Sequence, residues 1–139
     1  MKEIEIKLKI PDETLVKSRI KQSGAKYIGK FFQRDIWFDT EDKQFKRKGK
    51  GFRIRQQKGE ITLTLKDEQT FGKVRKAEEL EVAVDNFKNT FEILRRLGFV
   101  VDVEIKKERE IWVLGNIELA LDIVEKLGIF LELEGPQKI

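Results

Sequence analysis

The sequence contains no histidine and no cysteine, and these two absences exclude several kinds of active site. Without cysteine there is no disulfide, zinc-thiolate site, iron–sulfur cluster or thiol nucleophile. Without histidine there is no imidazole base, no Ser-His-Asp triad and no histidine-ligated metal. Any bound metal must therefore be held by oxygen atoms, which favours Mg²⁺, Mn²⁺ or Ca²⁺.

Long apolar segments are also missing. No stretch approaches the roughly 18 apolar residues of a membrane span, and the first residues, Met1–Glu5, lack the apolar core of a signal peptide. We therefore expect a cytoplasmic protein without membrane contact. Its 139 residues fit a single domain over 1–139. Charge is abundant instead: 39% of the residues are charged, against about 25% in typical domains, yet the net charge is only +4.

The apolar pattern predicts strands separated by two helices. Period-two alternation and short apolar runs bounded by turn residues predict strands at 3–10, 33–39, 52–57, 60–66, 79–84, 101–114, 117–124 and 129–134. Helical spacing predicts helices that follow Asp12 and then Asp85 or Asn86 and end at Gly24 and Gly98. Residues 41–50 and 67–76 are predicted to be loops, the second of them mobile. Seven aromatic residues could stack nucleic-acid bases, but most lie on apolar faces, so core packing is the favoured interpretation; they are Phe31, Phe32, Trp37, Phe38, Phe87, Phe91 and Trp112.

The two halves of the chain follow the same plan, β-α-β-β-β. Gln33–Phe38 lies 75 residues before Glu108–Val113, and Gly24 lies 74 residues before Gly98. The matching order of the elements favours an internal duplication over chance similarity between two amphipathic strands.

Five of the predicted strands carry like charges two residues apart. The pairs are Glu3/Glu5, Glu79/Glu81, Glu132/Glu134, Arg53/Arg55 and Lys107/Arg109. Residues i and i+2 share a strand face, and a merely solvated face would do better with mixed signs, because like-charged neighbours repel. The segregation predicts an acidic wall beside a basic wall, which suits a divalent cation and a polyphosphate. If the strands curl, the charged face becomes the lumen of a barrel.

In its order of motifs the chain resembles the CYTH superfamily, the triphosphate tunnel metalloenzymes, which include class IV adenylate cyclases and thiamine triphosphatases. Glu3-Ile4-Glu5-Ile6-Lys7 is similar to the N-terminal ExExK signature of that family. The later motifs that carry the resemblance are Gln33-x-Asp35-x-Trp37-Phe38, Phe52-Arg53-Ile54-Arg55, Leu63-Thr64-Leu65-Lys66, Glu79-x-Glu81, Lys107-x-Arg109, Leu121-Asp122 and Gly128-x-Phe130-Leu131-Glu132-Leu133-Glu134.

The resemblance implies an α+β fold: a closed or nearly closed antiparallel β-barrel with peripheral helices and charged side chains pointing inward. By analogy, the ligands of Mg²⁺ or Mn²⁺ would be Glu3, Glu5, Asp122, Glu132 and Glu134. The residues that bind the triphosphate and assist its reaction would be Lys7, Arg53, Arg55, Lys66, Lys107 and Arg109. Glu79 and Glu81 would line the tunnel, as metal ligands or as partners that orient the basic residues.

The implied chemistry is metal-assisted attack on a phosphoryl group. The motif order is most like that of class IV adenylate cyclases, which convert ATP to cyclic AMP and pyrophosphate. One alternative is a triphosphatase acting on thiamine triphosphate, a nucleoside triphosphate or inorganic tripolyphosphate. A second alternative is a non-catalytic nucleotide or nucleic-acid binding module. The acidic pairs argue against nucleic acid, which favours an uninterrupted basic surface. A homodimer is left open.

Two departures from the family pattern bear on these expectations. Position 77 is Ala, where a basic residue often precedes the second acidic pair, and the chain stops five residues after Glu134. We therefore expect a domain without the usual C-terminal extension. Its tunnel would be shorter, open on one side, or closed by a partner chain.

Overall fold

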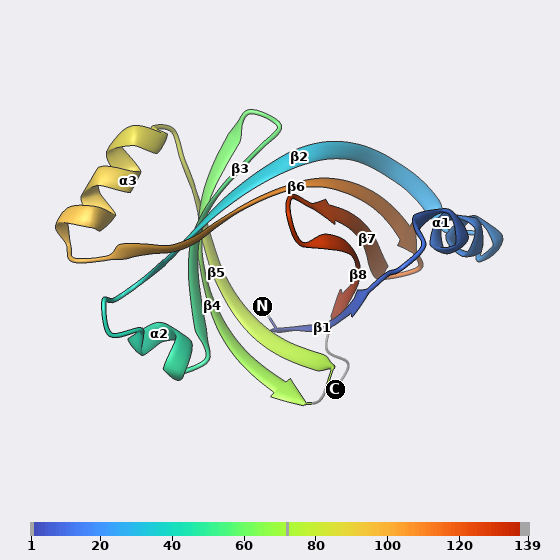
Figure 1. Cartoon of the computed structure of the whole chain (residues 1–139), viewed down its shortest axis with the longest axis horizontal. Helices are drawn as coiled ribbons and strands as arrows, with labels where there is room; N and C mark the ends of the chain where they lie inside the picture. Colours follow the sequence, from blue (N-terminus) through green and yellow to red (C-terminus); the bar gives the residue numbers. More distant parts are fainter. Residues whose placement is uncertain (1, 72, 137–139) are drawn as a thin grey trace.

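The described residues form a closed antiparallel barrel of eight strands with three helices outside it (Figure 1). The computed structural model describes residues 2–71 and 73–136, and it leaves out the side chains of 2–3, 69–71 and 75. The strands are β1 Lys2–Lys9, β2 Lys26–Asp39, β3 Lys50–Gln57, β4 Glu60–Phe71, β5 Val74–Val84, β6 Val100–Leu114, β7 Ile117–Val124 and β8 Gly128–Pro136. The helices are α1 Glu13–Gln22, α2 Gln44–Arg47 and α3 Phe87–Arg96.

The barrel closes within one chain. Around the ring the strands follow the order β1-β5-β4-β3-β2-β6-β7-β8, and β8 pairs with β1 from Glu3↔Pro136 to Lys9↔Phe130. The predicted α+β barrel is therefore confirmed. Closure needs neither an open side nor a partner chain, because β1 and β8 satisfy each other's backbone groups. None of the helices in the described part of the chain is long and apolar enough to cross a membrane.

The strand order bears out the duplicated plan at the level of elements. If β1 is exchanged with β5, β2 with β6, β3 with β7 and β4 with β8, every strand keeps the same kind of neighbour and the order around the ring is unchanged. The adjacent pairs β1–β5 and β2–β6 each exchange within themselves. The matched motifs are not equivalent in space. Trp37 lines the inner cavity, whereas Trp112 packs outside the barrel near Ile20 of α1. An offset of one residue moves a side chain to the opposite face of a strand, so the alignment of the two motifs by sequence was wrong in register.

Both long helices begin and end as their sequences predict. Asp12 Oδ1 accepts the backbone N–H groups of Thr14 and Leu15 at the start of α1, and Asn86 rather than Asp85 caps α3. Gly24 follows α1 with a φ of 83°, a left-handed conformation that costs glycine little.

Three predicted boundaries were wrong. Most of the predicted loop at 67–76 is not a loop: residues 67–71 belong to β4 and residues 74–76 to β5, and the two strands pair from Asp67↔Glu78 to Phe71↔Val74, while residue 72 lies outside the described residues. The polar sequence of these strand residues shows no alternation of apolar and polar residues, so it gave no strand signal. The hydrogen bonds between β4 and β5 hold them extended. Within 41–50 lies the short helix α2, whose first N–H groups at Phe45 and Lys46 bind the carboxylate of Asp39. Strand β2 begins at Lys26, seven residues before the predicted start.

The apolar faces of the strands point outward, and parts of them are covered by α1 and α3. Under α3, Ile36, Phe38 and Ile54 pack with Leu94, and four phenylalanines pack against them. A second cluster joins α1 to β6 and β7. The charged faces point inward, and eight of the buried residues on them are Glu5, Asp35, Arg53, Lys66, Lys107, Arg109, Asp122 and Glu132. The charged interior is therefore a property of the fold, since one face of each strand must line the lumen.

Candidate active site

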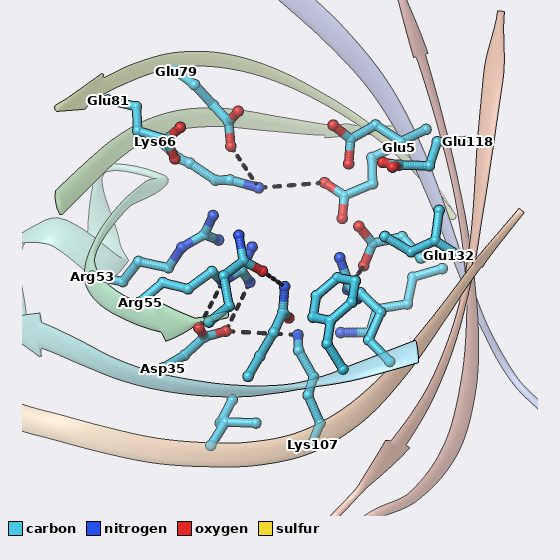
Figure 2. Close-up of a pocket in the computed structure, with 18 of the residues that line it drawn as sticks. Glu5, Asp35, Arg53, Arg55, Lys66, Glu79, Glu81, Lys107, Glu118 and Glu132 are labelled. Atoms are coloured by element: carbon cyan, nitrogen blue, oxygen red, sulfur yellow. Dashed lines mark hydrogen bonds and ion pairs between the residues drawn. The ribbon is translucent and has the colours of Figure 1, made fainter. Parts of the chain in front are cut away.

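A cavity of about 430 Å³ lies inside the barrel (Figure 2). The predicted site residues that line it are Glu5, Lys7, Arg53, Arg55, Lys66, Glu79, Glu81, Lys107, Arg109, Glu132 and Glu134. Asp122 is fully buried and lies outside this lining. The side chain of Glu3 lies outside the described residues, although β1 places its backbone opposite Ala77 and Pro136.

Three of the predicted metal ligands come together. Glu5, Glu132 and Glu134 each offer a carboxylate oxygen within 4.8 Å of the others. They meet because β1 and β8 are adjacent, with Glu5 directly opposite Glu134. Glu118 of β7 lies opposite Glu134 and also lines the cavity. Hard oxygen donors at this separation fit Mg²⁺ or Mn²⁺, which prefer carboxylates and water.

The electrostatics keep Glu132 ionised. Burial acts to raise the pKa of Glu132, but a hydrogen bond shared with Glu5 and the charges of Arg109 and Lys7 outweigh it and hold that pKa well below its usual range. Arg109 Nη2 lies 3.6 Å from the Glu132 carboxylate. A deprotonated carboxylate is the form that binds metal, so the cations prepare the acidic wall for its ligand.

Two arginines are held by carboxylates directly across from them. Arg109 Nε and Nη2 each donate to Asp122 at 2.7 Å, and Arg55 makes the same two-bond contact with Asp35 at 2.7 and 2.8 Å. Both pairs are register partners, Arg109↔Asp122 and Asp35↔Arg55. The geometry groups Asp122 with the basic wall and apart from the three clustered glutamates. Two parallel bonds fix the guanidinium plane as well as its position.

Lys107 lies between the two aspartates. Its Nζ is 3.6 Å from Asp35 and 3.7 Å from Asp122. Burial and the neighbouring Arg109 lower the pKa of Lys107 to about 8, although both aspartates act in the opposite direction. Lys107 is therefore poised to lose its proton in mildly alkaline solution.

The second acidic pair contacts groups on the neighbouring strand. Glu79 lies 3.0 Å from Lys66 Nζ, which is also 3.7 Å from Glu5. Glu81 accepts a hydrogen bond from the hydroxyl of Thr64 at 2.8 Å. Of the two, Glu79 contacts a basic residue and Glu81 contacts a hydroxyl group.

Arg53 is a buried cation with incomplete hydrogen bonding. Its relative accessibility is 6%, it lines the cavity, and its Nε has no hydrogen-bond partner among the described residues. Its guanidinium lies over the Trp37 ring, 5.3 Å from the centroid. Burial and the nearby charge of Arg55 lower its pKa. Figure 2 shows Arg53 and Arg55 facing the carboxylates across the cavity.

The structure adds residues that the sequence interpretation missed. Asp35 is a buried partner of Arg55, Glu118 joins the acidic wall, and Gln33 lines the cavity. Trp37 and Phe31 also line it, so their assignment to the core was wrong. Residues 31, 33, 35 and 37 share one strand parity, a signal that was present in the sequence.

The comparisons with known proteins agree with this geometry. The CYTH domain model matches residues 1–138. A Methanocaldococcus jannaschii protein named "putative adenylate cyclase" is 39% identical over 134 residues, which are 96% of this chain and 77% of that protein. The solved PH1012 protein of Pyrococcus horikoshii matches with a TM-score of 0.87 and 31% identity, over 99% of this chain and 80% of that one.

A more distant structure shares the fold. The Hippeastrum protein HpAC1, described as a "putative adenylyl cyclase" that reveals a dominant triphosphatase activity, matches with a TM-score of 0.73 and 21% identity, over 99% of this chain and 80% of that chain. The proteins that this chain resembles therefore include one named as an adenylate cyclase and, by fold alone, one described as having triphosphatase activity. The matched domain model, the relatives and the closed charged barrel together show that this chain belongs to the CYTH domain family.

Proposed function

We propose that the protein is a metal-dependent phosphoryl-transfer enzyme that acts on a triphosphate, and that its reaction is the conversion of ATP to cyclic AMP and pyrophosphate. The observation that carries the proposal is Arg53, a cation buried beside another arginine and aimed into a cavity whose opposite wall holds three clustered carboxylates. A buried charge is costly unless it is paired. A polyphosphate bound together with a divalent metal supplies partners to both walls.

The basic wall suits phosphate oxygens. Arg55 and Arg109 present guanidinium groups whose planes are set by Asp35 and Asp122, and Arg53 has a donor without a partner among the described residues. Lys7, Lys66 and Lys107 add point charges around the same cavity. Such preorganised donors stabilise charge that develops on a leaving pyrophosphate without reorganising during the reaction.

Glu5, Glu132 and Glu134 would hold the metal, with Glu3 as a further candidate ligand. A bound Mg²⁺ or Mn²⁺ would polarise the phosphate and neutralise part of its charge. The residues of the chain would align the triphosphate against that wall. Since the chain has no histidine, a carboxylate of the cavity would accept the proton from an attacking hydroxyl.

Triphosphate hydrolysis is the second candidate. The Hippeastrum protein, which shares this fold, is described as having a dominant triphosphatase activity. The same walls would serve both reactions, because they differ in which phosphorus is attacked and by which oxygen. Fold likeness alone does not choose between them.

Product analysis tests the proposal. The protein is incubated with ATP, thiamine triphosphate or tripolyphosphate, each with Mg²⁺ or Mn²⁺. Cyclic AMP with pyrophosphate supports the cyclase, and orthophosphate supports the triphosphatase. Binding without turnover would leave a non-catalytic module. Arg53→Met should abolish turnover, whereas Arg34→Met, which removes an arginine paired with Glu104 on the outer surface, should not.

A further inference from the structure

The cations that line the cavity differ in how they are held. Two buried arginines are fixed by carboxylates, Arg55 by Asp35 and Arg109 by Asp122, each through two hydrogen bonds. Lys58 also lines the cavity, yet it makes no ion pair among the described residues. Its Nζ lies over the Phe31 ring, 4.2 Å from the centroid. Lys58 is therefore a cation that is held by an aromatic ring instead of a carboxylate.

Lys58 stands where the cavity opens to solvent, because it is exposed and at the same time lines the cavity. It lies in the turn between β3 and β4, where Lys58 has a φ of 50° and Gly59 a φ of 76°. Two successive positive φ angles are those of a tight type I′ hairpin turn, which holds the backbone in one conformation. The side chain is a flexible four-carbon stem. The ammonium group can therefore move while the ends of the two strands stay in place.

Phe31 keeps this ammonium group beside the basic wall. Phe31 lies directly opposite Arg109 in the β2–β6 register, and both side chains line the cavity. Residues directly opposite each other in an antiparallel pair have Cβ atoms roughly 4.5–5.5 Å apart. A phosphate bound by Arg109 would thus lie within reach of the Lys58 ammonium group once that group leaves the ring.

The two possible partners of Lys58 differ in strength. A cation over a ring at an exposed site changes an equilibrium constant by about two- to fivefold, whereas a hydrogen bond to an ionised group changes it by about tenfold to a hundredfold. A phosphate oxygen should therefore displace the Phe31 ring as the partner of the ammonium group.

We propose that Lys58 is a latch that responds to the substrate. It rests on Phe31, and it turns to a phosphate oxygen across the mouth of the cavity when a triphosphate binds. The inference rests on the proposed function, because it requires a triphosphate on the basic wall. It adds a mobile cation, carried by the β3–β4 turn, to the cations that carboxylates hold in place.

Titration calorimetry with tripolyphosphate tests the latch, in EDTA so that turnover does not interfere. Lys58→Met keeps an unbranched side chain but removes the charge. Lys126→Met is the matched control, because Lys126 is an exposed lysine with a φ of 69° in the β7–β8 turn, outside the cavity lining. We expect Lys58→Met to weaken binding about tenfold, Lys126→Met to change it by less than about twofold, and Lys58→Arg to restore most of the affinity.

The ring that holds the ammonium group at rest gives a second readout. Phe31→Leu removes the contact that a bound phosphate has to break, so it should tighten tripolyphosphate binding by about two- to fivefold. The double variant Lys58→Met/Phe31→Leu should lose this gain. A lysine that merely adds distant positive charge to the cavity would show no such dependence on Phe31.

The outcomes separate this inference from the proposed function. If tripolyphosphate binds but Lys58→Met behaves like Lys126→Met, the latch is wrong while the polyphosphate site stands. If Lys58→Arg fails to restore affinity, or if Phe31→Leu weakens binding with and without Lys58, the contact between lysine and ring only supports the structure and the latch is again wrong. If the unaltered protein does not bind tripolyphosphate, even when Mg²⁺ replaces EDTA, both proposals fail.

Discussion

Arg109 and Asp122 face each other across the β6–β7 register and share two hydrogen bonds of 2.7 Å inside the barrel. Asp122 is completely buried. Burial opposes the charge on Arg109, but the bonds to Asp122 outweigh it and raise the pKa of Arg109 above its ordinary value. The pair places a permanently charged guanidinium in one orientation beside Glu132.

Asp122→Asn should lower turnover by about 10²-fold, because a small misplacement of a substrate-positioning group has an effect of that size. It should also lower the free energy of unfolding by about 3–5 kcal/mol, since it leaves Arg109 buried with a weakened partner. Steady-state kinetics and urea denaturation measure the two effects. Asp42→Asn removes an exposed carboxylate that contacts Arg47 and should change neither. Full activity in Asp122→Asn would contradict a positioning role.

Glu132→Gln should abolish the stabilisation of the protein by Mn²⁺. A ligand that binds only the folded state stabilises it by about 2.7 kcal/mol at a concentration one hundred times its Kd. The clustered carboxylates of Glu5, Glu132 and Glu134 should produce such a rise in Tm, and loss of one ligand should remove most of it. Differential scanning calorimetry with and without Mn²⁺ measures it. Glu125→Gln alters an exposed glutamate and should retain the rise. An equal rise in both variants would place the metal elsewhere.

Polyphosphate affinity should fall as the pH rises through about 8, where Lys107 loses its proton. Bound phosphate favours the charged form, so binding in this range takes up a proton. Arginine keeps its charge at this pH, so the affinity of Lys107→Arg for tripolyphosphate should change less between pH 7 and 9 than that of the wild type. Calorimetry with tripolyphosphate in EDTA, in buffers of different ionisation enthalpy, measures affinity and proton uptake. Identical pH profiles for the two proteins would contradict the prediction.

Lys107 should also make the free energy of unfolding depend on pH. Between pH 8 and its ordinary pKa of 10.5, Lys107 is more protonated in the unfolded chain than in the barrel. Stability rises with pH wherever the unfolded state binds more protons, so the contribution of Lys107 to the free energy of unfolding should increase over this interval. Chemical denaturation of the wild type and Lys107→Met at pH 7.5 and 9.5 should show the free energy of unfolding of the wild type rising relative to that of the variant as the pH increases.

Gly51→Ala should destabilise the protein by about 1–3 kcal/mol, the usual range for overpacking. A Cβ at position 51 would lie 2.7 Å from Cζ3 of Trp37, whose ring supports Arg53. Urea denaturation measures the loss, and Trp37 fluorescence should shift. Gly29→Ala is the control, because a Cβ there meets nothing within 4 Å. Equal stability of the two variants would show that Trp37 can move aside.

Strand alternation made the main elements and the segregated charges predictable. Residues two apart in a strand must share a face. The sequence therefore placed Glu5 and Lys7 on one face of the first strand, and Arg53 and Arg55 on one face of the third. The caps were predictable for a similarly local reason, since a capping side chain binds N–H groups within three residues: Asp12 was predicted outright, and Asn86 was one of two candidates. The strand residues within 67–76 could not be recognised from the sequence, because their extended conformation depends on the pairing between β4 and β5.

What the sequence by itself determined is a set of amphipathic strands, five of which carry a pair of like charges on one face, since side-chain parity is a local property of an extended backbone. The tertiary structure alone decided which faces meet. The ring order brings Glu5 to Glu134, and the register places Asp35 beside Arg55 and Asp122 beside Arg109. Closure of the barrel also placed the side chains of Trp37 and Phe31 in the lumen. These relationships join strands far apart in the chain, and only the hydrogen-bonded register of a closed barrel specifies them.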